Sequence, residues 1–316
     1  MNTSLVNDSS GPNFTSMNSG DSVVFCLPPW ILYAIDIQSV YISDIGIVAV
    51  NFPLAVFAAL VNLAVIVTVK RTPALHRPVN VLLCSLAAAD CLSGLVAQPI
   101  YATWRLLLHH TTNPCVLMLL YQATQSLPFL LVGCTFLNLA ITSVERLFAV
   151  SKPIVYSTTI TRRGMLKTVF CAWVIWFIYI IVLETAVPEV VYKPMENITL
   201  SSLIAFPIGG HVLTFFAIRT SNRRIVSVAH NSQQAFLFKR EKRAFTDMTM
   251  YTIATLCSIL PILLLLNVKG SVFSRNILFP WAATFTFLVS SFNPVIQIWR
   301  NATLRQALRA AIVHRS

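Results

Sequence analysis

Long apolar stretches separated by short polar connections follow one another along most of the chain. Seven of them hold about 20 or more largely uncharged residues, the length that a helix needs to cross a bilayer. A further apolar stretch, residues 23–35, is short, contains two prolines and precedes Asp36, so we expect it to lie outside the membrane. The pattern predicts an all-α membrane protein, a seven-transmembrane helix bundle with spans at residues 46–69, 80–103, 114–144, 165–187, 199–219, 246–268 and 277–299.

Composition and charge support a membrane protein and predict its orientation. The chain is 56% hydrophobic and 11% charged, whereas soluble domains carry about 25% charged residues. The net charge of +12 raises nucleic acid as a partner, but we find no basic groove with interleaved aromatic residues and expect none. Of the 23 lysines and arginines, 19 fall after the first, third and fifth spans and in the tail. Such connections face the cytosol.

This orientation divides the chain into three parts. Residues 1–45 form an extracellular segment, residues 46–299 the bundle, and residues 300–316 a cytoplasmic amphipathic helix with a short tail. We expect a multi-pass plasma-membrane protein with its N-terminus outside, in which the first span serves as the membrane anchor, because no cleavable signal peptide is apparent. Four Asn-x-Ser/Thr sites on the predicted outer face predict N-glycosylation: Asn2, Asn7, Asn13 and Asn197.

Cysteine positions suggest one disulfide. Of the seven cysteines, five lie well within the predicted spans, where packing explains them. Cys26 and Cys115 lie on the predicted outer side, where the compartment is oxidising. These two can therefore pair with each other, which would join the N-terminal segment to the third span.

Several polar residues interrupt the apolar spans. Asn62, Asp90 and Asn293 lie inside spans, while Glu145 and Arg146 stand together at the end of the third. An isolated asparagine in a membrane helix usually makes an interhelical hydrogen bond. A charged group there costs several kcal/mol unless it is paired, so Asp90, Glu145 and Arg146 should each have a partner.

Taken in order, these residues resemble the motifs of a known family. Asn62 is followed by LAAAD ending at Asp90, by ERLFAVSKPIVY at residues 145–156 and by NPVIQ at residues 293–297. Trp173, Pro207 and Pro261 mark the fourth, fifth and sixth spans, and a basic amphipathic segment follows the seventh. Residues 46–313 therefore resemble a rhodopsin-like (class A) G-protein-coupled receptor, with no subfamily assigned.

The resemblance implies a function. The chain is expected to be a cell-surface receptor, not an enzyme, that converts the binding of an extracellular ligand into activation of a heterotrimeric G protein. Arg146 would be held at rest by Glu145 and Glu241, and released when the sixth helix swings outward. Ile154 matches the family's apolar contact with the G protein, and Tyr156 supports that loop. The residues of this activation latch would be Glu145, Arg146, Glu241, Pro261, Asn293 and Pro294.

The resemblance also implies a sodium ion. Asp90, Thr135, Ser290 and Asn293 match positions that bind sodium in relatives, with Asn62 nearby. A carboxylate with neutral oxygen atoms suits a hard cation. The alternative is a polar network filled with water. No other metal or cofactor is expected.

For the ligand, the resemblance implies a mostly apolar pocket. Such a pocket suits a lipid-like or small neutral ligand, while the acids Asp36, Asp44, Glu184, Glu189 and Glu196 on the outer face would attract a basic peptide. Pro128 stands where amine receptors carry an aspartate and Phe287 where opsins carry a lysine, so neither an amine nor retinal is expected. The pocket candidates are Gln98, Trp104, Gln125, Phe129, Val132, Ile262, Leu266, Phe279 and Ala283.

Three residues depart from the family pattern. Ile259, Gln297 and Phe215 replace aromatic residues that take part in switching. A receptor-like scaffold that does not signal therefore stays open as an alternative. A transporter is the weaker alternative, because transporters often contain internal repeats and none is found here.

Overall fold

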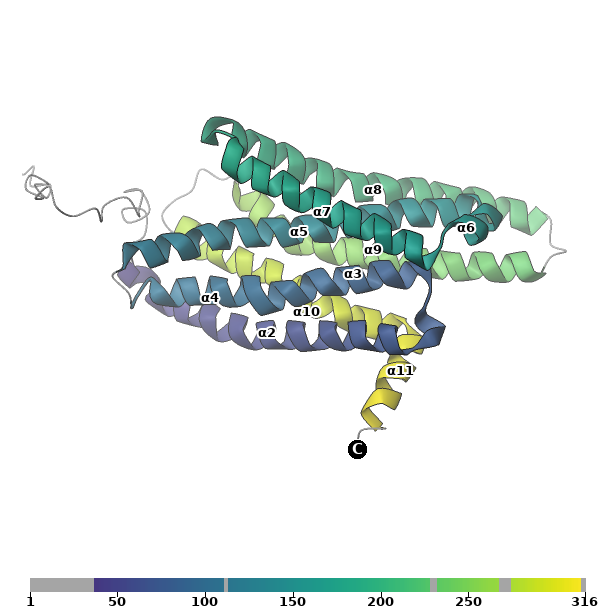
Figure 1. The fold of residues 1–316 in the computed structure, drawn as a ribbon, viewed down its shortest axis with the longest axis horizontal. Coiled ribbons are helices and arrows are strands. Elements are labelled where there is room, and N and C mark those ends of the chain that lie inside the picture. Colours follow the sequence, from purple (N-terminus) through teal and green to yellow (C-terminus); the bar gives the residue numbers. More distant parts are fainter. Residues whose placement is uncertain (1–36, 111–112, 228–231, 267–273, 314–316) are drawn as a thin grey trace, which may run out of the picture.

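The computed structural model describes residues 37–110, 113–227, 232–266 and 274–313. Within these ranges every regular element is a helix. Figure 1 shows long helices packed side by side along the longest axis of the molecule. The α helices are α2 (Ile37–Arg71), α3 (Pro78–Leu92), α4 (Gln98–Leu107), α5 (Pro114–Ser151), α6 (Pro153–Thr159), α7 (Arg162–Ala186), α8 (Glu189–Ser227), α9 (Ser232–Leu266), α10 (Phe279–Arg300) and α11 (Ala302–Val313).

Three short helical segments join the longer ones. η1 (Pro73–Leu75) is a turn of 3-10 helix between α2 and α3. η2 (Ser93–Ala97) is a π-helical turn that links α3 to α4 just before Pro99, where the ring of the proline disturbs the regular helix. η3 (Ser274–Leu278) is a second π-helical turn that leads into α10.

The all-α fold predicted from hydropathy is confirmed. Six helical segments of the described chain are long and apolar enough to cross a membrane. They correspond to the first six predicted spans, with α3, η2 and α4 forming the second. The seventh, α10, is not among the six because its polar residues lower its mean hydropathy; those that are buried include Thr284, Ser290, Ser291, Asn293 and Gln297.

The helices extend beyond the predicted spans. α2 begins at Ile37 rather than at residue 46, so it starts inside the segment expected to be extracellular. α5 continues to Ser151, seven residues past the predicted end of the third span. Both extensions carry charged residues, Asp44 in α2 and the Glu145–Arg146 pair in α5, which end an apolar stretch in the sequence but are buried in the bundle.

Small residues let the helices approach closely, as is common in membrane bundles. A side chain on Gly94 would come within 2.7 Å of the Ala55 carbonyl oxygen, so η2 lies directly against the backbone of α2. A side chain on Gly133 would overlap the indole of Trp176, which packs on this bare patch of α5 and donates a hydrogen bond to the Leu130 carbonyl at 2.8 Å.

The two ends of the bundle differ. One end carries the α4–α5 connection, and the other carries α6 and α11 (Figure 1). α11 turns away from the direction of the bundle but is anchored to it by Leu304, which is fully buried against Val65, Val69 and Leu83. We call these the α4–α5 end and the α6–α11 end.

Candidate functional site

A buried ion pair lies at the α6–α11 end. Glu145 and Arg146 are adjacent on α5, and both side chains are almost fully buried. The Nε and Nη2 atoms of Arg146 donate to the two carboxylate oxygens of Glu145. This bidentate geometry is the strongest arrangement for an arginine and a carboxylate.

Tyr156 on α6 completes this group. Its hydroxyl donates to the Glu145 carboxylate, and its ring lies 6.0 Å from the Arg146 guanidinium carbon. Phe148 packs edge-on against the same ring at 6.1 Å, so α6 is held against the end of α5. Glu241, the second acid expected to hold Arg146, lies on α9, but its side chain is outside the described residues, so this contact stays a prediction.

The surface next to the ion pair is apolar and exposed. α6 has no buried residue, and Ile154 and Val155 are 72% and 47% exposed. Tyr156 lies on the same short helix as Ile154, so α6 contacts the buried ion pair through Tyr156 and exposes Ile154. Such a surface is typical of a protein contact.

A polar network lies deeper, between α2, α3 and α10. Asn293 Nδ2 donates to the Asp90 carboxylate at 2.9 Å, and the Ser290 hydroxyl is also hydrogen-bonded to Asp90. Asn62 Nδ2 donates to the Ser290 carbonyl at 2.9 Å and joins α2 to α10. Thr135 on α5 is buried too, but its hydroxyl donates to the Leu131 carbonyl of its own helix. Thus four of the five predicted network residues are joined by these contacts.

The network has the chemistry of a cation site. The side-chain oxygens of Asn62 and Asn293 are buried without a hydrogen-bond donor. Within the described part of the chain, no lysine or arginine pairs with Asp90. One carboxylate with nearby unpaired oxygens is the ligand set that hard cations prefer, so the residues fit a sodium ion.

The residues predicted to line a ligand pocket occupy different surroundings. Gln98 is fully buried and donates to Asn51 on α2 at 3.1 Å. Trp104 and Ala283 pack in one apolar cluster with Tyr101 and Phe287. Phe129 packs on Trp176. Ile262 and Phe279 are half-buried, Val132 packs with Phe136, Gln125 is exposed, and the side chain of Leu266 is outside the described residues.

The sequence did not reveal a second buried ion cluster, which lies at the α4–α5 end. Asp44 on α2 is fully buried and accepts from Arg105 Nε at 2.7 Å and lies 2.7 Å from His109 Nε2. Arg105 also donates to the Asn276 carbonyl at 3.4 Å, which brings η3, the turn that leads into α10, into contact. Asp44 was expected to be a rim acid that attracts a ligand, and its burial is a correction.

A buried histidine links α8 to α9. His211 Nε2 lies 2.6 Å from the Thr252 hydroxyl, which itself donates to the Met248 carbonyl at 3.1 Å. The hydroxyl therefore accepts from the histidine. His211 was not singled out in the sequence because a lone histidine in an apolar span shows no pattern.

The three departures from the family pattern have different surroundings. Ile259 is buried against Phe136, Leu139 and Tyr251. Phe215 is 52% exposed and packs on Phe216 rather than inward. Gln297 is fully buried, yet neither of its amide atoms has a hydrogen-bond partner.

Some sequence predictions fall outside the described residues. Asn2, Asn7, Asn13 and Cys26 lie there. Asn197 is exposed on α8. Cys115 is disulfide-bonded, but its pairing with Cys26 stays a prediction.

Comparison with known proteins identifies similarity to one family. The family described as 7 transmembrane receptor (rhodopsin family) matches residues 61–296. Dopamine receptor 2 of Drosophila melanogaster is 29% identical over 133 residues, 41% of this chain and 24% of the relative. Trace amine-associated receptor 7d of Rattus norvegicus is 30% identical over 131 residues, 40% and 34% of the two chains. Muscarinic acetylcholine receptor M2 of Gallus gallus is 29% identical over 137 residues, 43% and 28%. The matches thus span about a quarter to a third of the relatives' length.

Proposed function

Because this chain belongs to the rhodopsin family of seven-transmembrane receptors, we propose that it converts the binding of an extracellular ligand into activation of a heterotrimeric G protein. The α6–α11 end would face the cytosol, which the concentration of lysine and arginine at that end supports. The observation that carries the proposal is the buried pair of Glu145 and Arg146 in contact with α6, the helix that exposes Ile154.

The pair acts as a latch in this proposal. At rest, Glu145 neutralises Arg146 and Tyr156 holds the carboxylate. Interactions of this kind are strong at a buried site because the local dielectric constant is low. When α9 moves outward about Pro261, the end of α5 becomes accessible. Arg146 can then leave its ion pair with Glu145 and contact the G protein. Ile154 supplies the apolar part of that contact.

The polar network would bias the same equilibrium. Asp90, Ser290 and Asn293, with the unpaired oxygen of Asn62, would hold a sodium ion between α2, α3 and α10. A bound cation would neutralise the buried Asp90 carboxylate and tie these helices together, so it would favour the resting arrangement. Sodium should then raise the melting temperature of the parent protein more than potassium does, and Asp90→Asn should abolish this difference.

For the ligand we propose a peptide or a lipid-like molecule. Pro128 is a half-buried residue of α5 and cannot supply the carboxylate that an amine would need. The Asp44 carboxylate, in the outer half of the described bundle, already contacts Arg105 and His109, so it does not provide a free carboxylate for an amine. An amine is the second candidate, because the relatives named above include dopamine, trace amine-associated and muscarinic acetylcholine receptors.

Basal G-protein activation in cells tests the proposal. The parent is compared with Arg146→Ala, with Gln297→Tyr and with Arg163→Ala, an exposed basic residue of α7 that serves as the matched control. We expect Arg146→Ala to abolish the basal signal and Arg163→Ala to leave it unchanged. A signal only in Gln297→Tyr would indicate that the latch is intact and that the missing tyrosine at position 297 weakens activation.

If all variants are silent at normal surface expression, a screen with tissue extracts follows, again against Arg146→Ala. A response of the parent that Arg146→Ala lacks would support a ligand-dependent receptor. Persistent silence with every G-protein class would contradict the proposal and favour the non-signalling scaffold.

A further inference from the structure

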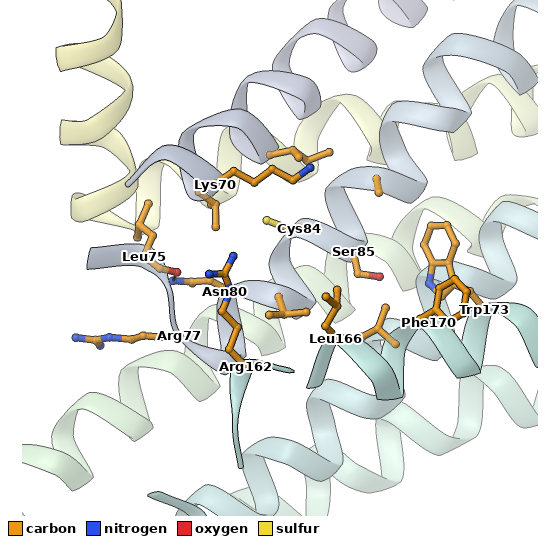
Figure 2. Close-up of a pocket in the computed structure, with 15 residues that line it drawn as sticks. Lys70, Leu75, Arg77, Asn80, Cys84, Ser85, Arg162, Leu166, Phe170 and Trp173 are labelled. Carbon is orange, nitrogen blue, oxygen red and sulfur yellow. Dashed lines mark hydrogen bonds between the residues drawn. The ribbon is translucent and has the colours of Figure 1, made fainter. Parts of the chain in front are cut away.

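A cleft opens at the α6–α11 end between α2, α3 and α7, away from the latch and the polar network. It has a volume of about 380 Å³. Figure 2 shows side chains from all three helices around it, with Arg77 and Arg162 toward one end and Phe170 and Trp173 toward the other. It therefore has a basic end and an apolar end.

Three cationic residues line the cleft. Lys70 ends α2, Arg77 precedes α3 and Arg162 begins α7, so residues far apart in the sequence bring three positive charges to one cleft. All three are exposed. Within the described residues, none has a carboxylate within 4.0 Å, because the ion pairs found there involve other residues. Three like charges without a counterion favour an anionic ligand.

The remaining wall is apolar. Leu166 and Phe170 are exposed on α7, and Val169 is buried between them at the α3 interface. Together with Ile66 they form an apolar lining against which a hydrocarbon chain can pack. Leu166 and Phe170 face the surroundings of the bundle, so a chain lying here would still be in contact with the bilayer.

Two polar groups at the inner end lack partners. The Ser85 hydroxyl and the Trp173 indole nitrogen are both buried without a hydrogen bond and both line the cleft. In Figure 2 both lie toward the end opposite Arg77. A hydrocarbon chain offers no hydrogen bond to these two groups, so they do not contribute to the recognition of a lipid in this cleft.

We propose that this cleft binds an anionic phospholipid of the cytosolic leaflet. Its headgroup, which has a net negative charge, is attracted by Lys70, Arg77 and Arg162, and one acyl chain lies along Leu166, Val169 and Phe170. Basic pockets between transmembrane helices on the cytoplasmic side hold anionic headgroups in this way. The proposal depends on the proposed function only for the orientation of the bundle, and it concerns a different site.

Lipid retention by the purified full chain tests the proposal. Detergent-solubilised protein is titrated with dioleoyl phosphatidylserine or dioleoyl phosphatidylcholine, which differ only in the headgroup, and bound lipid is counted by native mass spectrometry. The cleft variant is Lys70→Gln/Arg77→Gln/Arg162→Gln. The matched control, Arg71→Gln/Arg163→Gln/Lys167→Gln, removes three exposed charges of the same helices that do not line the cleft.

We expect the parent to prefer phosphatidylserine and the cleft variant to lose most of that preference, because three cations near an anionic headgroup correspond to about 100-fold in affinity. The control should keep it. Cys84→Phe, which fills the cleft without removing charge, should reduce retention of both lipids. All substituted charges are exposed, so unchanged melting temperatures should show that folding is intact.

Three results would overturn the proposal. Equal retention of both lipids by the parent would mean an apolar groove without headgroup recognition. An equal loss in the cleft variant and the control would mean diffuse charge attraction. Full displacement of phosphatidylserine by water-soluble glycerophosphoserine would mean an anion site that needs no lipid chain. None of these measurements uses a G protein, so they stand apart from the test of signalling.

Discussion

The two ends of this bundle each bury an arginine against a carboxylate, but they build the pair differently. At the α6–α11 end, Glu145 and Arg146 are neighbours on one helix, and their third partner comes from the adjoining α6. At the α4–α5 end, Asp44 on α2 meets Arg105 of α4 and His109 of the turn that follows α4, which are 61 and 65 residues away in the sequence. One group is local, and the other joins two helices.

This difference suggests two roles for similar chemistry. Arg146 can leave Glu145 without separating any helices, because both residues belong to α5. The Asp44 group cannot open without parting α2 from α4 or leaving charges buried without partners, which is strongly unfavourable. The first arrangement suits a switch, whereas the second suits a fixed tie between helices.

Breaking the tie should have the largest effect on stability. Asp44→Ala leaves Arg105 and His109 buried without their carboxylate and should cost about 3–5 kcal/mol. The melting temperature and surface expression should both fall. Glu184→Ala, which removes an exposed acid of α7, should change neither.

A double variant sharpens this prediction. Asp44→Ala/Arg105→Leu removes both charges and should recover a large part of the lost stability, because replacing a buried ion pair by apolar residues is often neutral. An unchanged melting temperature in Asp44→Ala alone would show that the cluster does not hold the helices together.

Breaking the latch should change signalling more than stability. Glu145→Gln keeps the shape of the side chain but removes its charge, and hydrogen bonds to charged groups contribute about 1.5–3 kcal/mol. Basal G-protein activation should rise about 10-fold or more. The melting temperature should fall less than in Asp44→Ala, because an arginine near the membrane surface can extend its charge into water. A variant no more active than the parent would contradict the latch.

Removing only the tyrosine hydroxyl should weaken the latch less than removing the charge of Glu145 does. Tyr156→Phe deletes one hydrogen bond to Glu145 and should raise basal activation several-fold, as expected for the loss of about 1 kcal/mol. Tyr179→Phe is the matched control, because its hydroxyl bonds Thr199 at 2.6 Å, far from the latch in the sequence. Equal effects of the two variants on signalling would point to general loosening of the bundle.

The smallest effect should have the opposite sign. Gln297→Leu replaces a fully buried amide without hydrogen-bond partners by an apolar side chain of similar size. Unpaired buried polar groups cost about 1–3 kcal/mol, so the resting protein should become more stable. Gln306→Leu, at an exposed position of α11, should leave the melting temperature unchanged. A lower melting temperature in Gln297→Leu would mean that water satisfies the amide within the polar network.

The helices themselves could be predicted from the sequence, because a membrane span requires a long uncharged stretch whatever its neighbours are. The order of motifs also sufficed to recognise the family, and the match over residues 61–296 confirms it. Adjacent residues such as Glu145 and Arg146 could be expected to interact, because their proximity is already present in the chain.

Contacts between segments that are distant in the sequence could not be predicted from the sequence. Asp44 marked the edge of a span until the fold placed Arg105 and His109 against it, and Gln98 was expected in a ligand pocket until the fold placed it against Asn51. Likewise, three separate basic residues became one cleft only where α2, α3 and α7 meet. Hydropathy determines which segments enter the membrane, since each segment meets lipid on its own. The partner of each buried polar group depends on how the helices pack, and only the tertiary structure decides that.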